Sequence, residues 1–248
     1  MTDYNVRRYD GTLYDTDRRT FLKLGLAAGL GSIVAACGWD GGNGVRPLLL
    51  DVSRLNDWVG EKILFSERRL APQYDVAERS ERLPSYFISP ELPMLQNPSA
   101  WRLQVGGLVR QPLSLSVADL QALPRTTYTV KHHCVEGWSA IATWHGVAVS
   151  VVAERAGLLP QARYVRFDSF DSGYFNGWDL ASAMHPQTIL AYGMNDNILP
   201  PTHGAPLRLY SPTKLGYKMT KYLVSMTFTA ERPGGYWEDQ GYPWFGGV

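Results

Sequence analysis

Cysteine is scarce in this sequence of 248 residues, in which only Cys37 and Cys134 occur. Two cysteines cannot build the disulfide framework on which small secreted domains depend. The sequence also lacks internal repeats, low-complexity tracts and long runs of one charge, and its net charge is +1. Nothing therefore indicates a nucleic-acid-binding surface. Hydrophobic residues make up 45% of the chain, enough for the core of one large domain or two small ones.

Long hydrophobic runs are missing too, because the apolar run near the N-terminus, Leu24 to Ala36, has only thirteen residues. A run of that length is too short to span a bilayer comfortably. It follows Arg18-Arg19 and Phe21, an order that resembles a twin-arginine export signal. It ends before Cys37 in a stretch that resembles a lipoprotein processing site. The alternative is a retained anchor helix in which Cys37 has no special role.

Three segments are expected on this basis. Residues 1–36 form the signal for export by the twin-arginine route, which carries proteins that have already folded. Residues 37–50 form a glycine-rich tether, and residues 51–248 form a single domain. That domain is expected in the periplasm or on the extracytoplasmic face of the membrane, with Cys37 as the candidate point of lipid attachment.

The domain mixes short predicted strands and short predicted helices, which is typical of an α+β fold. Ser116 with Asp119 three residues later predicts a capped helix start, and Asn195-Asp196 predicts a turn. Residues 51–98, with scattered prolines and charges, are expected to be irregular chain wrapped over the domain. Strands are predicted over 101–107, 126–134, 162–170, 188–194, 206–211 and 221–228, and helices over 116–123, 149–156 and 179–184.

Cys134 stands at the end of the predicted strand TTYTVKHHC. Side chains alternate along a strand, so Tyr128, Val130 and His132 share the face of Cys134, and His133 lies on the other. A zinc site needs three or four ligands, so one cysteine with two histidines on opposite faces disfavours zinc.

Two other roles for the thiol stay open at this point. A cysteine nucleophile would take its histidine from elsewhere in the chain, and the candidates are His145, His185 and His203. An inert buried thiol is the ordinary role of a lone cysteine on an apolar strand face.

Basic residues recur with glycine and proline in residues 200–224. Arg208 stands between two leucines in a run typical of a strand, where an unpaired charge is costly to bury. Such a cation usually has an anionic partner, and arginine matches the geometry of phosphate. Gly204 and Gly216 would let the backbone approach a ligand closely. The pattern indicates an anion site, with a solvated loop between two strands as the alternative.

Taken in order, these segments resemble the sulfite-oxidase-type molybdopterin-dependent oxidoreductases, above all the exported bacterial branch of methionine-sulfoxide-reductase catalytic subunits. The resemblance runs from about Leu83 to Pro243. It implies a molybdopterin-binding α+β domain of mixed sheets and short helices. The matching segments are HCVEGW (133–138), TWHGVAV (143–149), ARYVRFDS (162–169), AMHPQTILAYGMN (183–195), LPPTHGAPLRL (199–209), KLGYKMTKYLVSM (214–226) and GYWEDQGY (235–242).

The resemblance also accounts for the single thiol. A dithiolene pterin brings two sulfurs to molybdenum, so the protein needs to supply only one soft ligand. By resemblance that metal ligand is Cys134, and the cofactor is molybdenum-molybdopterin. His203 departs from the family's pattern, since exported relatives often carry asparagine there. The cofactor-binding residues that the resemblance implies are Phe87, Ser89, Ser169, His203, Arg208, Lys214, Gly216, Tyr217, Lys218, Met219, Thr220 and Lys221.

The implied reaction is oxygen-atom transfer, either reduction of an S-oxide or N-oxide or oxidation of a small substrate. Glu136 and His132 are the titratable residues nearest to Cys134 in sequence and are candidates for handling protons. Sulfite oxidases follow their cysteine with an arginine-rich stretch, whereas Glu136 stands here, which disfavours the sulfite anion. Aromatic residues proposed for the cavity entrance are Trp138, Trp144, Tyr174 and Trp178.

The sequence has no C-x-x-C-H motif, so no haem is expected in this chain. Electrons would come from a separate membrane or periplasmic electron-transfer protein. Three alternatives remain at this stage: a sulfite-type oxidase, a lipoprotein binding module that kept the fold without the chemistry, and a cysteine-dependent hydrolase.

Overall fold

The chain divides into two compact units, residues 1–51 and 52–248, and the computed structural model describes residues 45–248. The predicted export signal (1–36), Cys37 and the first part of the predicted tether (37–44) lie outside the described residues. The last six residues of that tether differ from the prediction, because helix α2 (Val45–Val59) begins there. Leucines at positions 48–50 follow the glycines and favour a helix.

The remaining helices are short: α3 (Val117–Gln121), α4 (Val149–Ala156), α5 (Leu180–Ala183), and the 3-10 or π turns η1 (Gly60–Leu64), η2 (Val76–Glu78), η3 (Pro98–Ala100), η4 (Pro201–His203), η5 (Gly216–Lys218) and η6 (Glu238–Gln240). The strands are β1 (Leu103–Gly107), β2 (Leu113–Leu115), β3 (Arg125–His133), β4 (Ser139–Ala148), β5 (Tyr164–Ser169), β6 (Phe175–Asp179), β7 (Ile189–Met194), β8 (Asn197–Ile198), β9 (Arg208–Tyr210) and β10 (Leu223–Thr229). Each predicted strand and helix is present within two residues of its predicted bounds or inside them.

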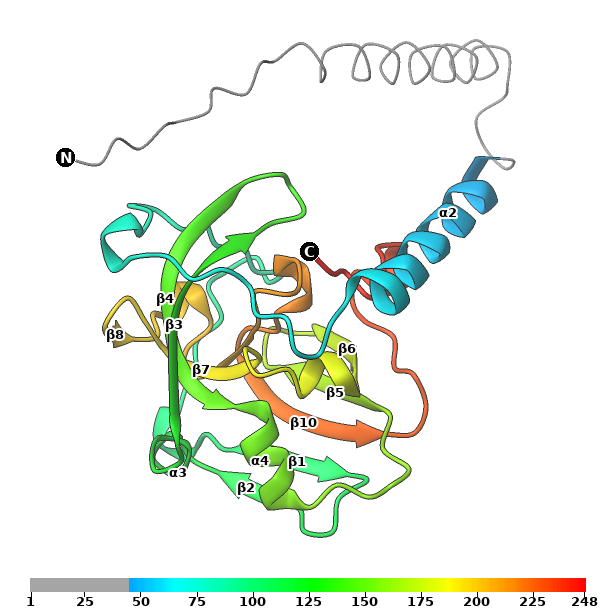
Figure 1. The fold of residues 1–248 in the computed structure, drawn as a ribbon. Helices are drawn as coiled ribbons and strands as arrows, with labels where there is room; N and C mark the ends of the chain where they lie inside the picture. The colour runs from blue at the N-terminus through cyan, green and yellow to red at the C-terminus, as the bar shows by residue number, and fades with distance from the viewer. Residues whose placement is uncertain (1–44) are drawn as a thin grey trace, which may run out of the picture. The chain divides into compact units, whose positions relative to one another are not determined.

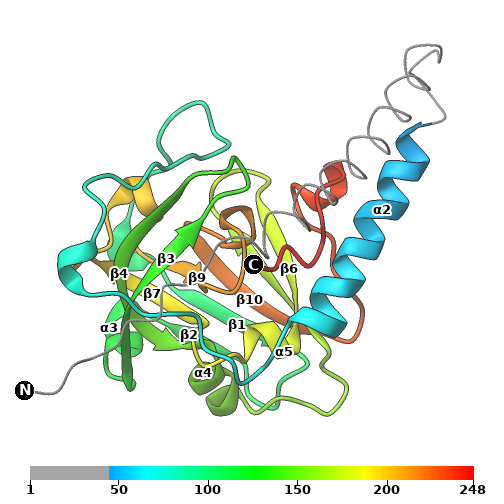
Figure 2. The same ribbon diagram turned by 45° about the horizontal axis from the view of Figure 1, so that its top comes forward.

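Within residues 52–248 the strands form two five-stranded sheets (Figure 1). One sheet has the order β2-β1-β10-β5-β6, with β1 and β10 parallel and its other pairs antiparallel. The other has the order β3-β4-β7-β8, and β9 also pairs with β7. Figure 2 shows β3, β4 and β7 on one side of the domain and β10 and β6 on the other. The mixed sheets and short helices confirm the predicted α+β class.

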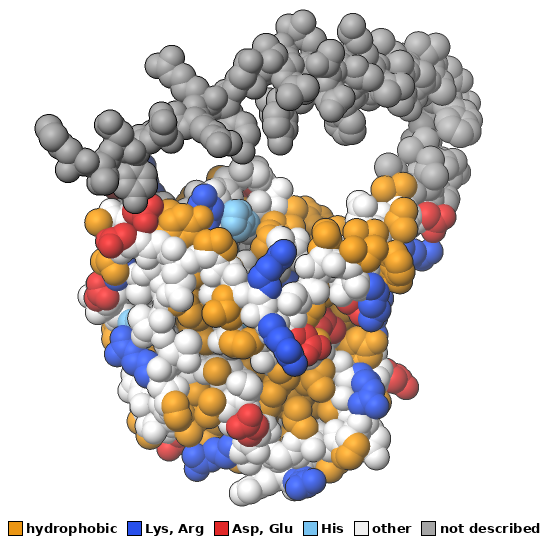
Figure 3. Space-filling view, viewed as in Figure 1, with side chains coloured by type: hydrophobic (Ala, Val, Ile, Leu, Met, Phe, Trp, Pro, Cys, Tyr) orange, Lys and Arg blue, Asp and Glu red, His pale blue; other side chains and the backbone are white. Residues whose placement is uncertain are grey.

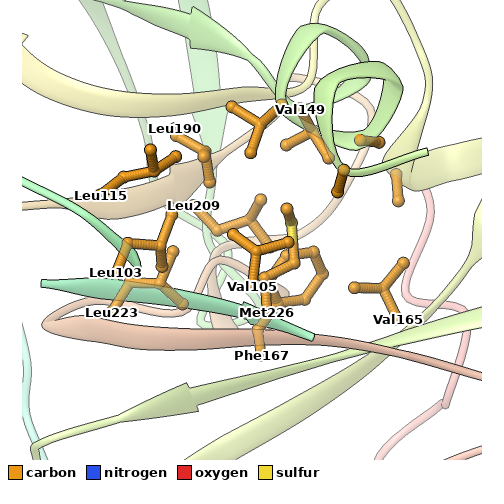
Figure 4. Packing of buried hydrophobic residues seen from close by; sticks show 14 of the residues in the cluster. Leu103, Val105, Leu115, Val149, Val165, Phe167, Leu190, Leu209, Leu223 and Met226 are labelled. Atoms are coloured by element: carbon orange, nitrogen blue, oxygen red, sulfur yellow. The ribbon is translucent and has the colours of Figure 1, made fainter. Parts of the chain in front are cut away.

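A large hydrophobic cluster joins the two sheets. Figure 4 shows its members from the first sheet, such as Leu103 and Met226, against Leu190 and Leu209 from the second. Helix α4 contributes Val149 to the same cluster. Burial of such side chains is the main source of the domain's stability. A second cluster lies among β3, β4, β7 and β9, on the side of the second sheet that leads to the cavity described below.

Local sequence signals mark where several of these elements begin or end. The Ser116 hydroxyl accepts from the Asp119 N–H at 3.1 Å, and the Asp119 carboxylate accepts from the Ser116 N–H at 2.8 Å, which is the predicted capping box. Gly157 ends α4 with φ of +69°. Asn195 and Asp196 also have positive φ and form the predicted turn between β7 and β8.

The predicted side-chain alternation of β3 is confirmed. Tyr128 and Val130 belong to the second cluster, and the ring of His132 stacks on Tyr210. On the edge of β3, the Tyr74 N–H donates to the Thr129 carbonyl at 2.9 Å. On the other face of the sheet, Nε of Arg79 donates to the Thr143 hydroxyl at 2.7 Å. The wrapping chain begins later than predicted, since α2 and η1 occupy residues 45–64. No helix in the described part of the chain has the length and apolar character needed to cross a membrane.

Candidate functional site

A cavity of about 210 Å³ receives residues from both sheets. Its walls come from residues 83–88, the turn after β3, the end of β5, the start of β9, the loop before β10 and the C-terminal segment. The predicted site residues that line it are His132, Cys134, Glu136, Phe87, Ser169, His203, Arg208, Gly216, Tyr217, Met219 and Lys221. The fold therefore brings together residues up to 134 positions apart in the sequence.

The turn after β3 brings Cys134 to the cavity wall. The Cys134 N–H donates to the Trp138 carbonyl at 3.0 Å, and the Gly137 N–H donates to the Cys134 carbonyl at 3.1 Å. Gly137 has φ of +90°, which glycine adopts without steric cost. These bonds fix residues 134–138 as a tight connection between β3 and β4, so the position of the thiol is set by the backbone.

Burial raises the pKa of the Cys134 thiol above its ordinary value. A thiol in this state keeps its proton near neutral pH until a cation displaces it. This disfavours a free thiolate nucleophile and suits a metal ligand. Of the histidines considered as partners, His203 lines the cavity, whereas His145 and His185 do not. Within the described residues, no three His, Cys, Asp or Glu side chains are grouped so that they could hold a metal ion by themselves.

Glu136 lies beside the thiol, with its Oε2 3.9 Å from Sγ of Cys134. The same oxygen accepts a hydrogen bond from Nε1 of Trp138 at 3.0 Å. The Trp138 ring packs against His132, with 5.6 Å between ring centres. An aromatic side chain therefore holds the exposed carboxylate next to the thiol.

His132 is buried and stacks on Tyr210, with ring centres 5.9 Å apart. Burial and the charge of Arg208 lower the pKa of His132 to about 3, so its imidazole is neutral at ordinary pH. Its Nδ1 has no hydrogen-bond partner in the described chain. A Cβ on Gly216 would lie 2.9 Å from its Nε2, so glycine allows the loop before β10 to pack this closely.

Arg208 is buried at the start of β9. Its guanidinium donates to the carbonyls of His203 at 3.1 Å and Leu209 at 3.4 Å, and it lies over the Trp144 ring. Burial lowers the pKa of Arg208 to about 10. Among the residues that the structure describes, no carboxylate forms an ion pair with it. A buried charge with only carbonyl and aromatic partners is an energetically costly arrangement unless an anion completes it.

Lys221 is a second cation in the same cavity. Its Nζ donates to the Ser85 hydroxyl at 3.0 Å and to the Tyr86 carbonyl. Burial and the charge of Arg208 lower the pKa of Lys221 to about 7. Burial, Arg208 and Lys221 together lower the pKa of His203 to about 4. The three basic groups disfavour one another's charges, and an anion between them would relieve this repulsion.

Hydroxyl groups surround this basic end of the cavity. The Ser169 hydroxyl donates to the Lys221 carbonyl at 2.8 Å and accepts from the Asp171 N–H at 2.9 Å. Tyr222, with φ of +55°, lines the cavity, and its hydroxyl has no partner in the described chain. Thr220 is buried outside the lining, and its hydroxyl is likewise without a partner among the described residues.

Lys214 and Lys218 do not line the cavity, contrary to the prediction. Nζ of Lys214 donates to the Phe245 carbonyl at 2.8 Å and lies 3.5 Å from Asp179. Nζ of Lys218 donates to the Gly177 carbonyl and to the Glu238 carboxylate. Both ammonium groups are buried against carboxylates and carbonyls of other segments, so their positive charges are paired within the protein.

Ser89 is also outside the lining, because its N–H and hydroxyl donate to the Asp171 carboxylate. Of the four aromatic residues proposed for the entrance, Trp138 and Tyr174 line the cavity, whereas Trp144 and Trp178 are buried in the core. The lining residues that the sequence analysis missed include Asp171, Trp237 and Tyr242. The last two lie in GYWEDQGY, the segment that matched the family without an assigned role.

Residues 90–237 match the family described as Oxidoreductase molybdopterin binding domain. This chain belongs to that family. It is a molybdopterin-dependent oxidoreductase, as the resemblance implied.

Two relatives match most of the chain. It is 38% identical to a protein of Azospira oryzae provisionally named protein-methionine-sulfoxide reductase subunit YedZ1, over 93% of this chain and 87% of that protein. It is 30% identical to the protein-methionine-sulfoxide reductase catalytic subunit MsrP of Campylobacter jejuni, over 89% of this chain and 76% of that protein. In a solved structure, the sulfane dehydrogenase SoxCD of Paracoccus pantotrophus, 40% of one chain superposes on 56% of this one, with a TM-score of 0.53 and 23% identity. That likeness confirms the fold.

The cavity fits the group that the family binds. It combines one thiol, two buried or largely buried cations without a carboxylate ion pair in the described chain, and polar atoms such as His132 Nδ1 that lack partners there. A phosphorylated pterin would offer the anion and the acceptors that these groups need.

Proposed function

We propose that this protein reduces a sulfoxide, with Cys134 as the protein's ligand to the molybdenum of a molybdopterin cofactor. One observation carries the proposal: the Cys134 thiol lines the same cavity as Arg208 and Lys221, which form no ion pair within the described residues. A thiol alone would suit many roles, and two cations alone would suit any phosphate. Their meeting in one cavity suits a cofactor that carries both a soft metal and a phosphate.

The chain would hold the cofactor both by its phosphate and by its metal. Arg208, Lys221 and His203 would hold its phosphate, and Ser169 with the loop before β10 would supply further polar contacts. Cys134 would give up its proton and bind the metal as a thiolate. When bound, the molybdenum cofactor supplies two-electron oxygen-atom transfer. The side chains around it bind the substrate, orient it and control access of water.

The substrate that fits best is an uncharged S-oxide group, such as that of a methionine sulfoxide side chain. The relatives YedZ1 and MsrP are named for that activity. The Glu136 carboxylate, 3.9 Å from Sγ of Cys134, would repel an anion such as sulfite and leave a neutral sulfoxide unaffected. Trp138, Trp237 and Tyr242 give the cavity apolar walls that suit a thioether chain.

Conversion of a sulfoxide to a thioether consumes two electrons and two protons and releases one water molecule. The electrons would come from a separate membrane or periplasmic protein, because this chain has no haem-attachment motif. Glu136 is exposed and adjoins the thiol, so it is the carboxyl group best placed to exchange protons between solvent and the substrate. His132 is neutral and would act as a hydrogen-bonding wall of the site.

Export by the twin-arginine route belongs to the same proposal and rests on Arg18-Arg19 and the apolar run that follows. Folding and cofactor insertion before export would agree with a route that carries folded proteins. Attachment of a lipid at Cys37 would then keep the enzyme beside its membrane electron donor.

The decisive experiment measures molybdenum and pterin in the purified protein and in Cys134→Ser. We expect about one molybdenum atom per native chain and less than about a tenth of that in Cys134→Ser, because a hydroxyl is a poor ligand for a soft metal. Cys37→Ser is the matched control and should keep the metal. Retention of full molybdenum by Cys134→Ser would rule out the assigned ligand.

A second measurement tests the direction of the reaction. With a chemically reduced dye as the electron donor, the native protein should reduce methionine sulfoxide. With an oxidised dye as the electron acceptor, it should not oxidise sulfite. Efficient sulfite oxidation without sulfoxide reduction would instead identify a sulfite-type oxidase.

A further inference from the structure

Helix α2 presents an apolar stripe to solvent. Val52, Leu55 and Trp58 are 46%, 58% and 54% exposed, which is high for large hydrophobic side chains. At about 100° per residue they fall within an arc of roughly 120° around the helix axis, and the exposed Asp51 lies near one edge of the same arc. We call these three residues the outer stripe.

The opposite side of the same helix binds the domain through a polar residue. The Asp57 carboxylate accepts hydrogen bonds from the N–H groups of Trp244 at 2.5 Å and Phe245 at 2.8 Å. Asp57 and Leu55 lie roughly 160° apart around the axis. A Cβ on Gly60 would lie 3.1 Å from the Phe245 ring, so this position also faces the domain.

This orientation is the reverse of the usual one. A surface helix normally turns its apolar stripe to the core and its polar residues to water. Here the polar contact fixes the helix, and rotating the outer stripe inward would break both hydrogen bonds of Asp57. The hydrogen bonds of Asp57 therefore keep the outer stripe exposed to solvent.

Two more exposed hydrophobic residues lie just beyond the helix. Ile63 and Leu64, the last residues of η1, are 61% and 64% exposed. Figure 3 shows hydrophobic side chains gathered over the region of α2. Single exposed hydrophobic residues such as Ile198 need no explanation, but a contiguous group on a soluble domain marks a surface that binds something.

We propose that the outer stripe docks on a lipid surface. The helix begins eight residues after Cys37, the candidate point of lipid attachment, so its first residue would stay within roughly 27 Å of an attached lipid. Trp58 stands in the stripe, and tryptophan favours the boundary between lipid and water. A helix with one apolar side lies in the plane of that boundary with this side in the lipid.

The inference goes beyond the proposed reaction and does not depend on it, because a protein without molybdenum carries the same stripe. Docking by α2 would add a second contact to any membrane attachment of the N-terminal segment. Two weak membrane contacts together hold a protein far more firmly than either does alone.

The test uses the full chain with vesicles of phosphatidylcholine that carry bromine on their acyl chains, since bromine quenches tryptophan within the bilayer. The native protein should lose more fluorescence than Trp58→Phe, and the difference belongs to Trp58 alone. Leu55→Glu should lower the vesicle partition coefficient about tenfold or more, because it places a charge in the apolar contact. Ile198→Glu is the matched control at an exposed hydrophobic residue outside the stripe and should bind like the native protein.

Equal quenching of the native protein and Trp58→Phe would overturn the proposal, even if residues 24–36 bind the same vesicles. If brominated lipid does not quench Trp58, and the native protein self-associates whereas Leu55→Glu does not, the stripe would instead bind a second copy of this chain. Thermal melting and molybdenum content should be the same in all four proteins, since every substituted side chain is exposed.

Discussion

The Arg208 guanidinium lies over the Trp144 ring, with its central carbon 4.9 Å from the ring centre. Trp144 is itself buried and stacks on Tyr210, with ring centres 4.1 Å apart. The cation is therefore held by aromatic faces and backbone carbonyls rather than by a carboxylate of the described chain. Such a site keeps a positive charge ready for an anionic ligand, at a cost in stability when that ligand is absent.

Arg208→Met should separate the contribution of this cation to cofactor binding from its cost to the stability of the cofactor-free protein. Loss of the cation should lower the pterin content of the purified protein to less than about a tenth of the native value. The cofactor-free variant should be at least as stable as the cofactor-free native protein, because an unpaired buried charge has been removed. Pterin fluorescence after oxidation and thermal melting measure the two quantities. Arg166→Met is the control, since Arg166 pairs with Asp168 away from the cavity.

Phosphate binding to the cofactor-free protein should weaken as the pH rises above about 7. The pKa of Lys221 is lowered to about 7, and only its protonated form pairs with a phosphate group. Above that pH each binding event must take up a proton, so affinity should fall by up to about tenfold per pH unit. Calorimetric titration with inorganic phosphate measures this dependence, and Lys221→Met should abolish it. A flat profile for the native protein would contradict the assignment.

The buried pair of Lys218 and Glu238 should be a major determinant of stability. Glu238→Ala would leave the Lys218 ammonium buried with the Gly177 carbonyl as its hydrogen-bond partner and no carboxylate within salt-bridge distance in the described chain. Removal of one partner from a buried pair costs about 3–5 kcal/mol in the free energy of unfolding. Urea unfolding should detect this loss, and Lys218→Met combined with Glu238→Ala should recover much of it. Equal stability of the single and double variants would indicate that the pair carries no coupling.

Glu136→Gln should change which small anions reach the thiol. Removal of the negative charge should strengthen inhibition by sulfite severalfold while molybdenum content stays the same. The inhibition constant for sulfite against sulfoxide reduction measures the effect. Glu136→Asp, which keeps the charge, is the matched control. Unchanged inhibition in Glu136→Gln would show that the carboxylate does not control anion entry.

Much of the site could be predicted because its chemistry is local in the sequence. Alternation along the predicted strand 126–134 put Cys134 on the face of Tyr128 and Val130, and the structure has it in the turn directly after β3. The two leucines around Arg208 indicated a buried cation, which the structure confirms. The positions of Lys214 and Lys218 could not be predicted in this way. Their partners, such as Glu238, are 20 or more residues away, and a sequence pattern does not show which of two anions a lysine will reach.

Strand β4 was missed for a different reason. Most of its residues are buried on both faces, so the alternation of apolar and polar residues that marks a half-buried strand is absent. Gly146 within it also weakens a strand prediction. The structure explains that glycine, because a Cβ there would lie 2.1 Å from the Leu190 carbonyl oxygen of the neighbouring strand β7.

Strand β10 lies between β1 and β5, and it is parallel to β1 although more than a hundred residues separate them. During synthesis, the thiol of Cys134 leaves the ribosome well before Arg208, Lys221 and the strand that completes the sheet. The cavity cannot exist on a partly made chain. Cofactor insertion is therefore a step that follows translation. A cell that lacks the cofactor would accumulate a complete chain whose cavity holds two cations without a bound anion.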